Sequence, residues 1–337
     1  MGRFTWTHCW QHPRDISVKR LVLATILVAM LALVSLFIGV YSLSWRDLLA
    51  GGDDGRNVMV LAVSRVPRTL AIILAGMSMS VAGMIMQMLA RNKFVEPSTA
   101  GTVESASLGI LAVTILAPGT ALIYKMGIAA VFALLGTGLF LLILRQVPLR
   151  SPLVVPLIGI MLGGVVSSIT TFFAYRYDLL QSLSSWTTGD FSGVLRGRYE
   201  LLWISGALTL LAFIAADRFT VVGMGEEFTT NLGLNYRAVI TLGMVIVSLV
   251  TAVDVVTVGA IPFLGLIVPN VVSVIMGDNV RRAIPWVAVL GAGFVLLCDI
   301  VGRTVRYPYE IPIGTVVGVV GSVLFLFMLL RRTSRVG

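Results

Sequence analysis

The amino-acid sequence predicts an all-α protein in which a bundle of helices crosses a membrane many times. Of the 337 residues, 57% are hydrophobic and only 12% are charged, whereas soluble domains contain about 25% charged residues. The apolar residues lie in long runs along the whole sequence, and no polar stretch between them is long enough to fold alone. We therefore expect one polytopic membrane domain without an appended soluble domain.

Ten apolar runs are candidates for membrane helices. The first, 21–40, follows a basic tail, as the apolar core of a secretory signal peptide does. Such a core has only about 7–15 residues, and no A-x-A cleavage pattern ends this run, so we interpret it as a membrane helix. Run 263–276 is short and contains Pro269, which makes it a candidate for a broken or partial span. The remaining runs are 66–89, 102–117, 121–144, 153–175, 200–216, 238–256, 284–301 and 312–330.

The distribution of Lys and Arg sets the expected orientation. With ten helices both ends of the chain lie on one side, and placing them in the cytoplasm puts more basic residues in cytoplasmic than in outer loops. The bias is weaker than usual. Either one helix is assigned incorrectly in this topology, or some outer arginines bind an acidic partner. Membrane proteins keep Lys and Arg in their cytoplasmic loops, which accounts for the formal net charge of +9. We therefore do not interpret this charge as a sign of nucleic-acid binding, and we expect the chain to contact membrane lipid. The expected division is a tail at 1–20, a single transmembrane permease domain at 21–332 and a tail at 333–337.

Two polar segments stand out between the runs. Residues 222–237, in the cytoplasmic loop 217–237, contain adjacent Glu226 and Glu227, and each charge at the centre of a bilayer costs at least about 2.5 kcal/mol. This segment must lie in water, either as a small rigid knob for a partner or as a solvated connector, and the residues alone leave both open. The largest outer segment, 176–199, is predicted to form a short surface helix from near Leu179 to near Gly189.

The sequence carries no signature of catalysis, of a bound metal or of nucleotide binding. Both histidines, His8 and His12, lie in the N-terminal tail beside Cys9, and three ligands in such a tail are a weak indication of a metal site. A P-loop needs a Gly-Lys pair, and no lysine here follows a glycine. We therefore expect no catalytic residue, no metal and no cofactor, and an ATP-driven process would need its ATPase on another polypeptide.

Six motifs occur in the order found in one transporter family. Over roughly residues 60–332 the chain resembles the permease subunits of iron–siderophore and cobalamin ATP-binding-cassette (ABC) importers, the FecCD type. It departs from the family at Asn270, where His is common, and at Asn92-Lys93, where Asn-Pro is common. The motifs are RVPRTLAIILAG at 65–76, VAGMIMQMLARNKFVEPSTAG at 81–101, GEEFTTNLGLN at 225–235, GAIPFLGLIVPNVV at 259–272, GDNVRRAIP at 277–285 and the sequence from 299 onward that begins DIVGRTVRYPYEIPIG.

The resemblance implies a type II ABC importer permease of about ten helices in the plasma (inner) membrane of a bacterium, with both termini cytoplasmic. It also implies a second permease, identical or homologous, separate ABC ATPase subunits, and a soluble substrate-binding protein outside. The implied cargo is a ferric siderophore, with cobalamin or haem left open. An ion-coupled secondary transporter is the alternative of another class; it would need a buried acid near mid-membrane, and Asp254 and Glu104 come nearest, both close to predicted helix ends.

The resemblance also implies roles for particular residues. Arg65 and Arg68 of R-x-P-R, and Arg303 of D-I-x-x-R, resemble sockets for acidic side chains of the binding protein; arginines that snorkel to lipid phosphates are the alternative. We expect Asp299 to pair with Arg303 or Arg306, and Glu310 to pair with one of the docking arginines or to cap a turn. The segment 222–237 resembles the family's coupling segment, two short helices that dock on the ATPase, and its residues of interest are Gly225, Glu226, Glu227, Leu232 and Gly233.

A translocation path is the least defined of the expected sites. Met84 and Met88 recur at helical spacing with Gln87 beside them, and flexible thioethers suit a bulky ligand. Ser168 and Thr171 in the fifth run are small and hydroxylated, as pore-lining residues often are. Ordinary helix packing explains both sets equally well.

Overall fold

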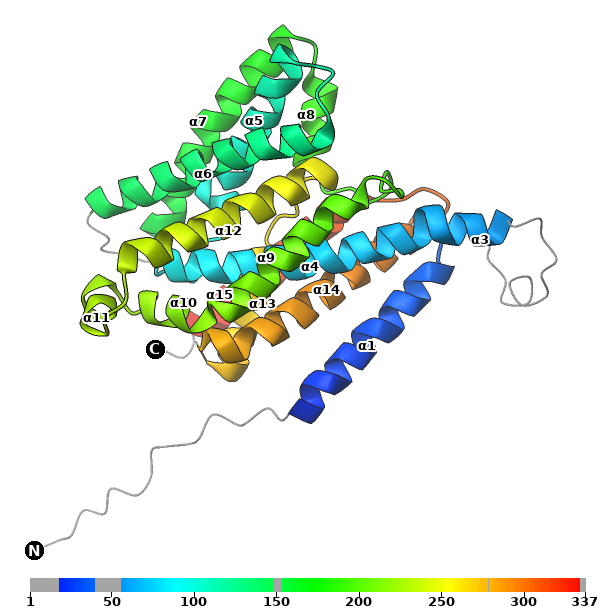
Figure 1. The fold of residues 1–337 in the computed structure, drawn as a ribbon. Helices are drawn as coiled ribbons and strands as arrows, with labels where there is room; N and C mark the ends of the chain where they lie inside the picture. Colours follow the sequence, from blue (N-terminus) through cyan, green and yellow to red (C-terminus); the bar gives the residue numbers. More distant parts are fainter. Residues whose placement is uncertain (1–17, 40–55, 148–152, 278, 334–337) are drawn as a thin grey trace, which may run out of the picture.

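The computed structural model describes residues 18–39, 56–147, 153–277 and 279–333, and all secondary structure in these ranges is helical. Each of the ten predicted runs coincides with a helix, as Figure 1 shows. These helices are α1 (Val18–Phe37), α4 (Val66–Leu89), α5 (Thr102–Leu116), α6 (Leu122–Gln146), α7 (Val154–Arg176), α9 (Leu202–Ile214), α12 (Tyr236–Thr257), α13 (Leu264–Met276), α14 (Val280–Thr304) and α15 (Ile313–Thr333).

The helices differ in how they could cross a membrane. In the described residues, six are long and apolar enough to do so alone, whereas α9, with the turn before it, passes this test only together with α10 (Ala216–Val222), from which it is bent by 65°. The other three predicted runs are the shorter apolar helices α5, α13 and α15. Helix α13 has only 13 residues and keeps Pro269 inside it, so the run 263–276 forms one short helix without a break.

Several short elements complete the chain. Helix α3 (Arg56–Val60) and the π-helix η1 (Leu61–Arg65) extend α4 toward its N-terminus. Helix α8 (Leu180–Thr187) is the predicted surface helix. Helix α11 (Glu226–Asn231) follows α10. The 3-10 turns η2 (Ser98–Ala100) and η3 (Tyr199–Leu201) precede α5 and α9. Figure 1 places α10 and α11 at one end of the bundle, the α11 end, and α3 at the opposite end, the α3 end.

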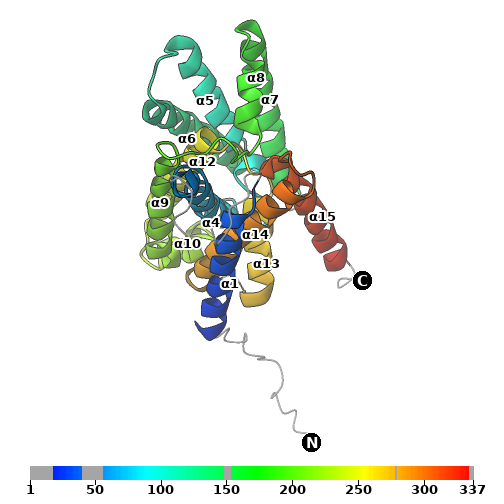
Figure 2. The ribbon, with the colours of Figure 1, turned by 90° about the vertical axis from the view of Figure 1, so that its right-hand side faces the viewer.

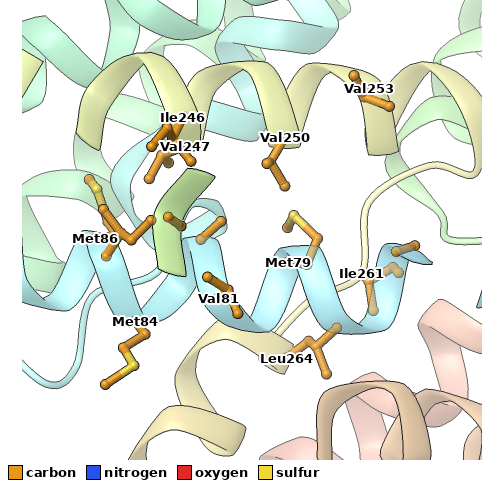
Figure 3. Close-up of a cluster of buried hydrophobic side chains, with 14 of the residues drawn as sticks. Met79, Val81, Met84, Met86, Ile246, Val247, Val250, Val253, Ile261 and Leu264 are labelled. Carbon is orange, nitrogen blue, oxygen red and sulfur yellow. The ribbon is translucent and has the colours of Figure 1, made fainter. Parts of the chain in front are cut away.

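Helix α4 is the centre of the bundle. It packs against α9, α12, α13 and α14, which surround it when the bundle is viewed from the α3 end (Figure 2). Small residues allow this close packing: a Cβ added to Gly83 would lie 2.2 Å from the Cα of Gly265 in α13. Methionines fill the remaining space, and in Figure 3 Met79 and Met86 point toward α12 whereas Met84 points away from it.

Helix α13 begins inside the protein and is held there by the loop before α5. Phe263 precedes it with a left-handed φ of 61°, and its backbone N–H donates to Oε1 of Glu96 at 2.9 Å. Ser98 donates to the same carboxylate oxygen at 2.5 Å. Burial raises the pKa of Glu96, although these hydrogen bonds act in the opposite direction. Glu96 therefore fixes the start of α13 against the loop that follows α4.

Candidate functional site

The predicted cytoplasmic loop 217–237 forms a compact structure with α10 and α11, although only α11 lies within the segment 222–237 that was predicted to contain two short helices. Gly225 separates α10 from α11 with φ 119° and ψ 168°, a conformation that is essentially restricted to glycine. The buried Thr229 joins the two helices, because its hydroxyl donates to the carbonyl of Gly225 at 2.6 Å and to that of Val221 at 3.2 Å. The segment is thus braced by its own hydrogen bonds and is not an extended connector.

The end of α11 explains the predicted break at Gly233. The N–H of Gly233 donates to the carbonyl of Thr230 at 2.9 Å, and that of Leu234 donates to Thr229 at 3.2 Å. This pair of bonds is a Schellman motif, with Gly233 in the left-handed conformation at φ 77°. Asn235 then caps α12 by accepting from the N–H of Ala238 at 3.1 Å. We call residues 216–235 the coupling knob, after the role predicted for this loop.

The coupling knob presents apolar and acidic side chains to its surroundings. Met224, Phe228 and Leu232 are 62%, 48% and 57% exposed and are spaced four residues apart. Glu226 and Glu227 are exposed in the first turn of α11, where their negative charge interacts favourably with the positive end of the helix dipole. Exposed apolar residues on a rigid polar segment are typical of a protein-binding surface. The sequence prediction included Leu232 but omitted Met224 and Phe228, although their four-residue spacing inside a polar segment could have indicated them.

Two of the three predicted docking arginines, Arg68 and Arg303, share a buried ionic network at the α3 end. Arg68 forms salt bridges to Asp299 at 2.8 Å and to Glu310 at 2.7 Å. Asp299 is fully buried and also pairs with Arg303. The predicted pairs Asp299–Arg303 and Glu310–arginine are therefore confirmed, and the network joins α4 to α14 and to the turn before α15.

Arg65 and Arg303 also hold the end of α1. Arg303 donates to the carbonyls of Ser35 at 3.1 Å and Ile38 at 2.7 Å, and Arg65 donates to the carbonyl of Leu36 at 2.6 Å. Carbonyls in the last turn of a helix lack partners within the helix and attract cations. Arg65 is 7% and Arg303 is 6% exposed, so both guanidinium groups are engaged within the chain. Their docking role stays a prediction, and a partner carboxylate would have to compete with these contacts.

Other arginines at the same end face outward. Arg196, Arg198 and Arg306 are exposed, and we call them the exposed arginine set. The N–H of Arg196 donates to the carbonyl of Val63 at 3.0 Å, which places this loop beside η1. The guanidinium of Arg306 lies 5.9 Å from the ring centre of Tyr309. Among the described residues, no carboxylate forms an ion pair with this set.

A cavity of about 550 Å³ lies between α5, α7, α8 and residues 260–262. Figure 1 shows these three helices together on one side of the bundle. Glu104 provides the only carboxylate in its lining, and Oε2 of Glu104 is buried without a hydrogen-bond partner in the described structure. The other polar residues of the lining are hydroxylated: Ser98, Ser107, Ser167, Thr170, Thr171, Ser184 and Thr187. This hydroxyl-lined cavity can hydrogen-bond an oxygen-rich ligand.

The predicted path residues do not share one cavity. Thr171 lines the hydroxyl-lined cavity, whereas Gln87 and Met88 line a second cavity of about 510 Å³ at the α11 end. Met84 is buried in the apolar core, and neither cavity is lined by Met84 or Ser168. The path through these five residues therefore stays a prediction, and packing accounts for Met84.

Asp254, one of the two acids considered for ion coupling, is buried within the bundle. Its carboxylate accepts hydrogen bonds from Ser205 at 3.1 Å and from Ser78 at 3.3 Å. These contacts join α12 to α9 and α4, so packing accounts for Asp254. Glu104 lies in the first turn of α5 and Asp254 near the end of α12, as predicted.

These features define a class of protein, a many-helix membrane protein with a braced knob at one end. Residues 26–331 match the FecCD transport family, and the chain belongs to this family. The petrobactin import system permease protein YclN of Bacillus subtilis (strain 168) is 52% identical over 309 residues, covering 92% of this chain and 97% of the relative. The ferric-anguibactin transport system permease protein FatD of Vibrio anguillarum is 40% identical over 297 residues, covering 88% and 94%.

A solved structure supports the fold independently. An inward-facing metal-chelate type ABC transporter superposes with a TM-score of 0.79 at 24% identity, covering 94% of this chain and all of the other. The predicted all-α membrane fold and the predicted family are therefore both confirmed.

Proposed function

We propose that this chain is the membrane-spanning subunit of an ATP-driven importer that moves a ferric siderophore into a bacterial cell. The relatives that are 52% and 40% identical are named for the import of petrobactin and anguibactin, which supports siderophore as cargo. The observation that carries the proposal is the coupling knob, because a braced segment with exposed apolar residues is suited to transmit force from a partner.

The partner at the coupling knob is an ABC ATPase. Hydrolysis takes place in that subunit, because this chain lacks the Gly-Lys pair of a P-loop, and we assign no catalytic residue to the chain. The α11 end then faces the cytoplasm of the plasma (inner) membrane, with both termini on that side. Residues 21–332 act as one permease domain.

A second permease, identical or homologous, completes the path. Helices α7 and α15 expose long apolar faces, including Val165 and Ile169 on α7 and Val319 and Val323 on α15. A second copy of this fold against these faces would bring the hydroxyl-lined cavity close to the interface. Nucleotide binding at the knobs would then rock the two permeases between outward-open and inward-open states.

The substrate-binding protein docks at the α3 end in this arrangement. The predicted sockets are Arg65, Arg68 and Arg303, and the exposed arginine set offers further cations that already face outward. Arginine suits this role because its guanidinium binds a carboxylate through two hydrogen bonds. Exposed arginines reach an acidic partner without giving up internal contacts.

Gentle solubilisation and affinity capture of this chain test the assembly. We expect an ABC ATPase to co-purify, and the presence or absence of a second homologous permease distinguishes heterodimer from homodimer. A chain that purifies alone, under conditions that keep a control importer intact, would contradict the proposal and favour an ion-coupled transporter.

A further inference from the structure

The second cavity, at the α11 end, borders the coupling knob, which contributes Gly223 and Met224 to its lining. Its volume is about 510 Å³. It opens between the end of α4, the loop that follows it, the end of α10 and the start of α14. It is lined by Gln87, Met88, Arg91, Asn92, Lys93, Thr220, Gly223, Met224 and Asn279, and we call it the Arg91 cavity.

In the part of the chain that the structure describes, the lining of the Arg91 cavity is basic and contains no acid. Arg91 and Lys93 supply two cations, while three amides and one hydroxyl supply further polar groups. Nζ of Lys93 is held by a hydrogen bond to Oγ of Ser273 at 2.9 Å. Among the described residues, no carboxylate forms an ion pair with Arg91. Such a lining selects an anion with several acceptor oxygens.

Arg91 occupies a backbone position that favours glycine. Helix α4 ends in a Schellman motif, in which the N–H of Arg91 donates to Met88 at 3.2 Å and that of Asn92 donates to Gln87 at 2.9 Å. Arg91 therefore has a left-handed φ of 48°, which is uncommon for residues other than glycine, asparagine and aspartate. The turn does not favour arginine at this position, so we attribute the presence of Arg91 to a role of its side chain.

The N-terminus of α14 strengthens the positive character of the site, and the coupling knob borders it. Asn279, in the lining, caps the N-terminus of the 25-residue helix α14, whose first turn contains no acid. The positive end of that helix dipole therefore lies at the cavity. The guanidinium of Arg91 lies against the coupling knob, because a Cβ added to Gly225 would be 3.2 Å from its Nη1.

We propose that the Arg91 cavity binds the phosphate headgroup of an anionic membrane lipid. Basic pockets between membrane helices on the cytoplasmic side bind such headgroups. Met88 and Met224 provide apolar surface beside the charges, which suits the glycerol and upper acyl region of a lipid. A headgroup in this cavity would lie between α4 and the coupling knob, so lipid composition would affect coupling.

Lipid binding to the full-length purified protein tests this directly. Delipidated protein is titrated with phosphatidylglycerol or phosphatidylcholine, and bound lipid is counted by native mass spectrometry. We expect selective retention of phosphatidylglycerol by the wild type. Loss of one cation, in R91G or K93Q, weakens it about fivefold, and the double variant about 25-fold. R91K retains binding.

The choice of variants separates binding from folding. R91G places glycine where the backbone favours it, so we expect an unchanged melting temperature. R218Q and R237Q remove exposed arginines at the same end that do not line the cavity, and they serve as matched controls.

Three results would overturn the proposal. One is equal retention of phosphatidylglycerol by wild type, R91G and K93Q, and another is an equal loss in the control variants. The third is that soluble sn-glycerol 3-phosphate binds as tightly as the lipid, which would assign the cavity to a soluble phosphate compound. The assay does not measure transport, so its failure is distinct from a failure of the proposed importer function.

Discussion

The buried network at the α3 end yields a prediction that separates a structural role from a docking role. Asp299 is fully buried and pairs with both Arg68 and Arg303. Asp299→Asn keeps the shape of the side chain but leaves two buried guanidinium groups with one fewer counter-charge. Removing one partner of a buried ion pair costs about 3–5 kcal/mol.

The expected shift is large enough to measure in detergent. At about 2–4 °C per kcal/mol, Asp299→Asn should lower the apparent melting temperature by about 6–20 °C. Scanning fluorimetry at a fixed heating rate provides the measurement, since membrane proteins often unfold irreversibly. Asp178→Asn is the matched control, because Asp178 is exposed and its φ of 57° is tolerated by asparagine. A melting temperature for Asp299→Asn within about 1 °C of wild type would refute the structural role.

Three further predictions concern coupling, docking and packing. Changing Glu226 and Glu227 together to Arg should abolish ATP-driven uptake at unchanged expression and melting temperature, and normal uptake would argue against a coupling role. Changing the exposed arginine set to Glu should weaken binding of the substrate-binding protein at least about tenfold and reduce its salt dependence; unchanged affinity in nanodiscs would exclude these arginines from docking. Gly83→Ala should lower the free energy of unfolding by about 1–3 kcal/mol, because the new Cβ would clash with the backbone of α13. Gly127→Ala is the control: a Cβ there has nothing within 4 Å, so this variant should be as stable as wild type or more stable. Equal melting temperatures for the two variants would contradict the packing described for α4.

The positions of the helices could be predicted from the sequence, but their neighbours could not. The runs that form α1 and α4 are both strongly apolar. In the most apolar 18-residue stretch of each, however, 6% of the residues are buried for α1 and 83% for the helical segment Val58–Leu89, which contains α4. Lipid and protein interior are equally apolar, so hydropathy does not distinguish a helix at the periphery from one at the centre. Glycines at contact positions, such as Gly83, carry that information only once the partner helix is known.

The same limit explains which site residues could be anticipated. Asp299 and Arg303 are four residues apart on one helix, so their pairing follows from local geometry. The contact of Arg303 with the end of α1 joins residues 268 positions apart in sequence, and no local pattern indicates it. The preference of glycine for left-handed backbone conformations is also a local property, so the break at Gly233 could be predicted. The two cavities depend on how several helices pack and were not.

ATP-driven uptake in reconstituted vesicles tests the central claim most directly. The permease assembly, co-purified with its ATPase, is placed in proteoliposomes with the substrate-binding protein outside and ATP inside, and labelled iron is supplied as a ferric siderophore. We expect iron to accumulate only when ATP and the binding protein are both present, and cobalamin or haem not to compete. Accumulation that needs an ion gradient but no ATP, or no accumulation of any ferric siderophore by an assembly with active ATPase, would contradict the claim.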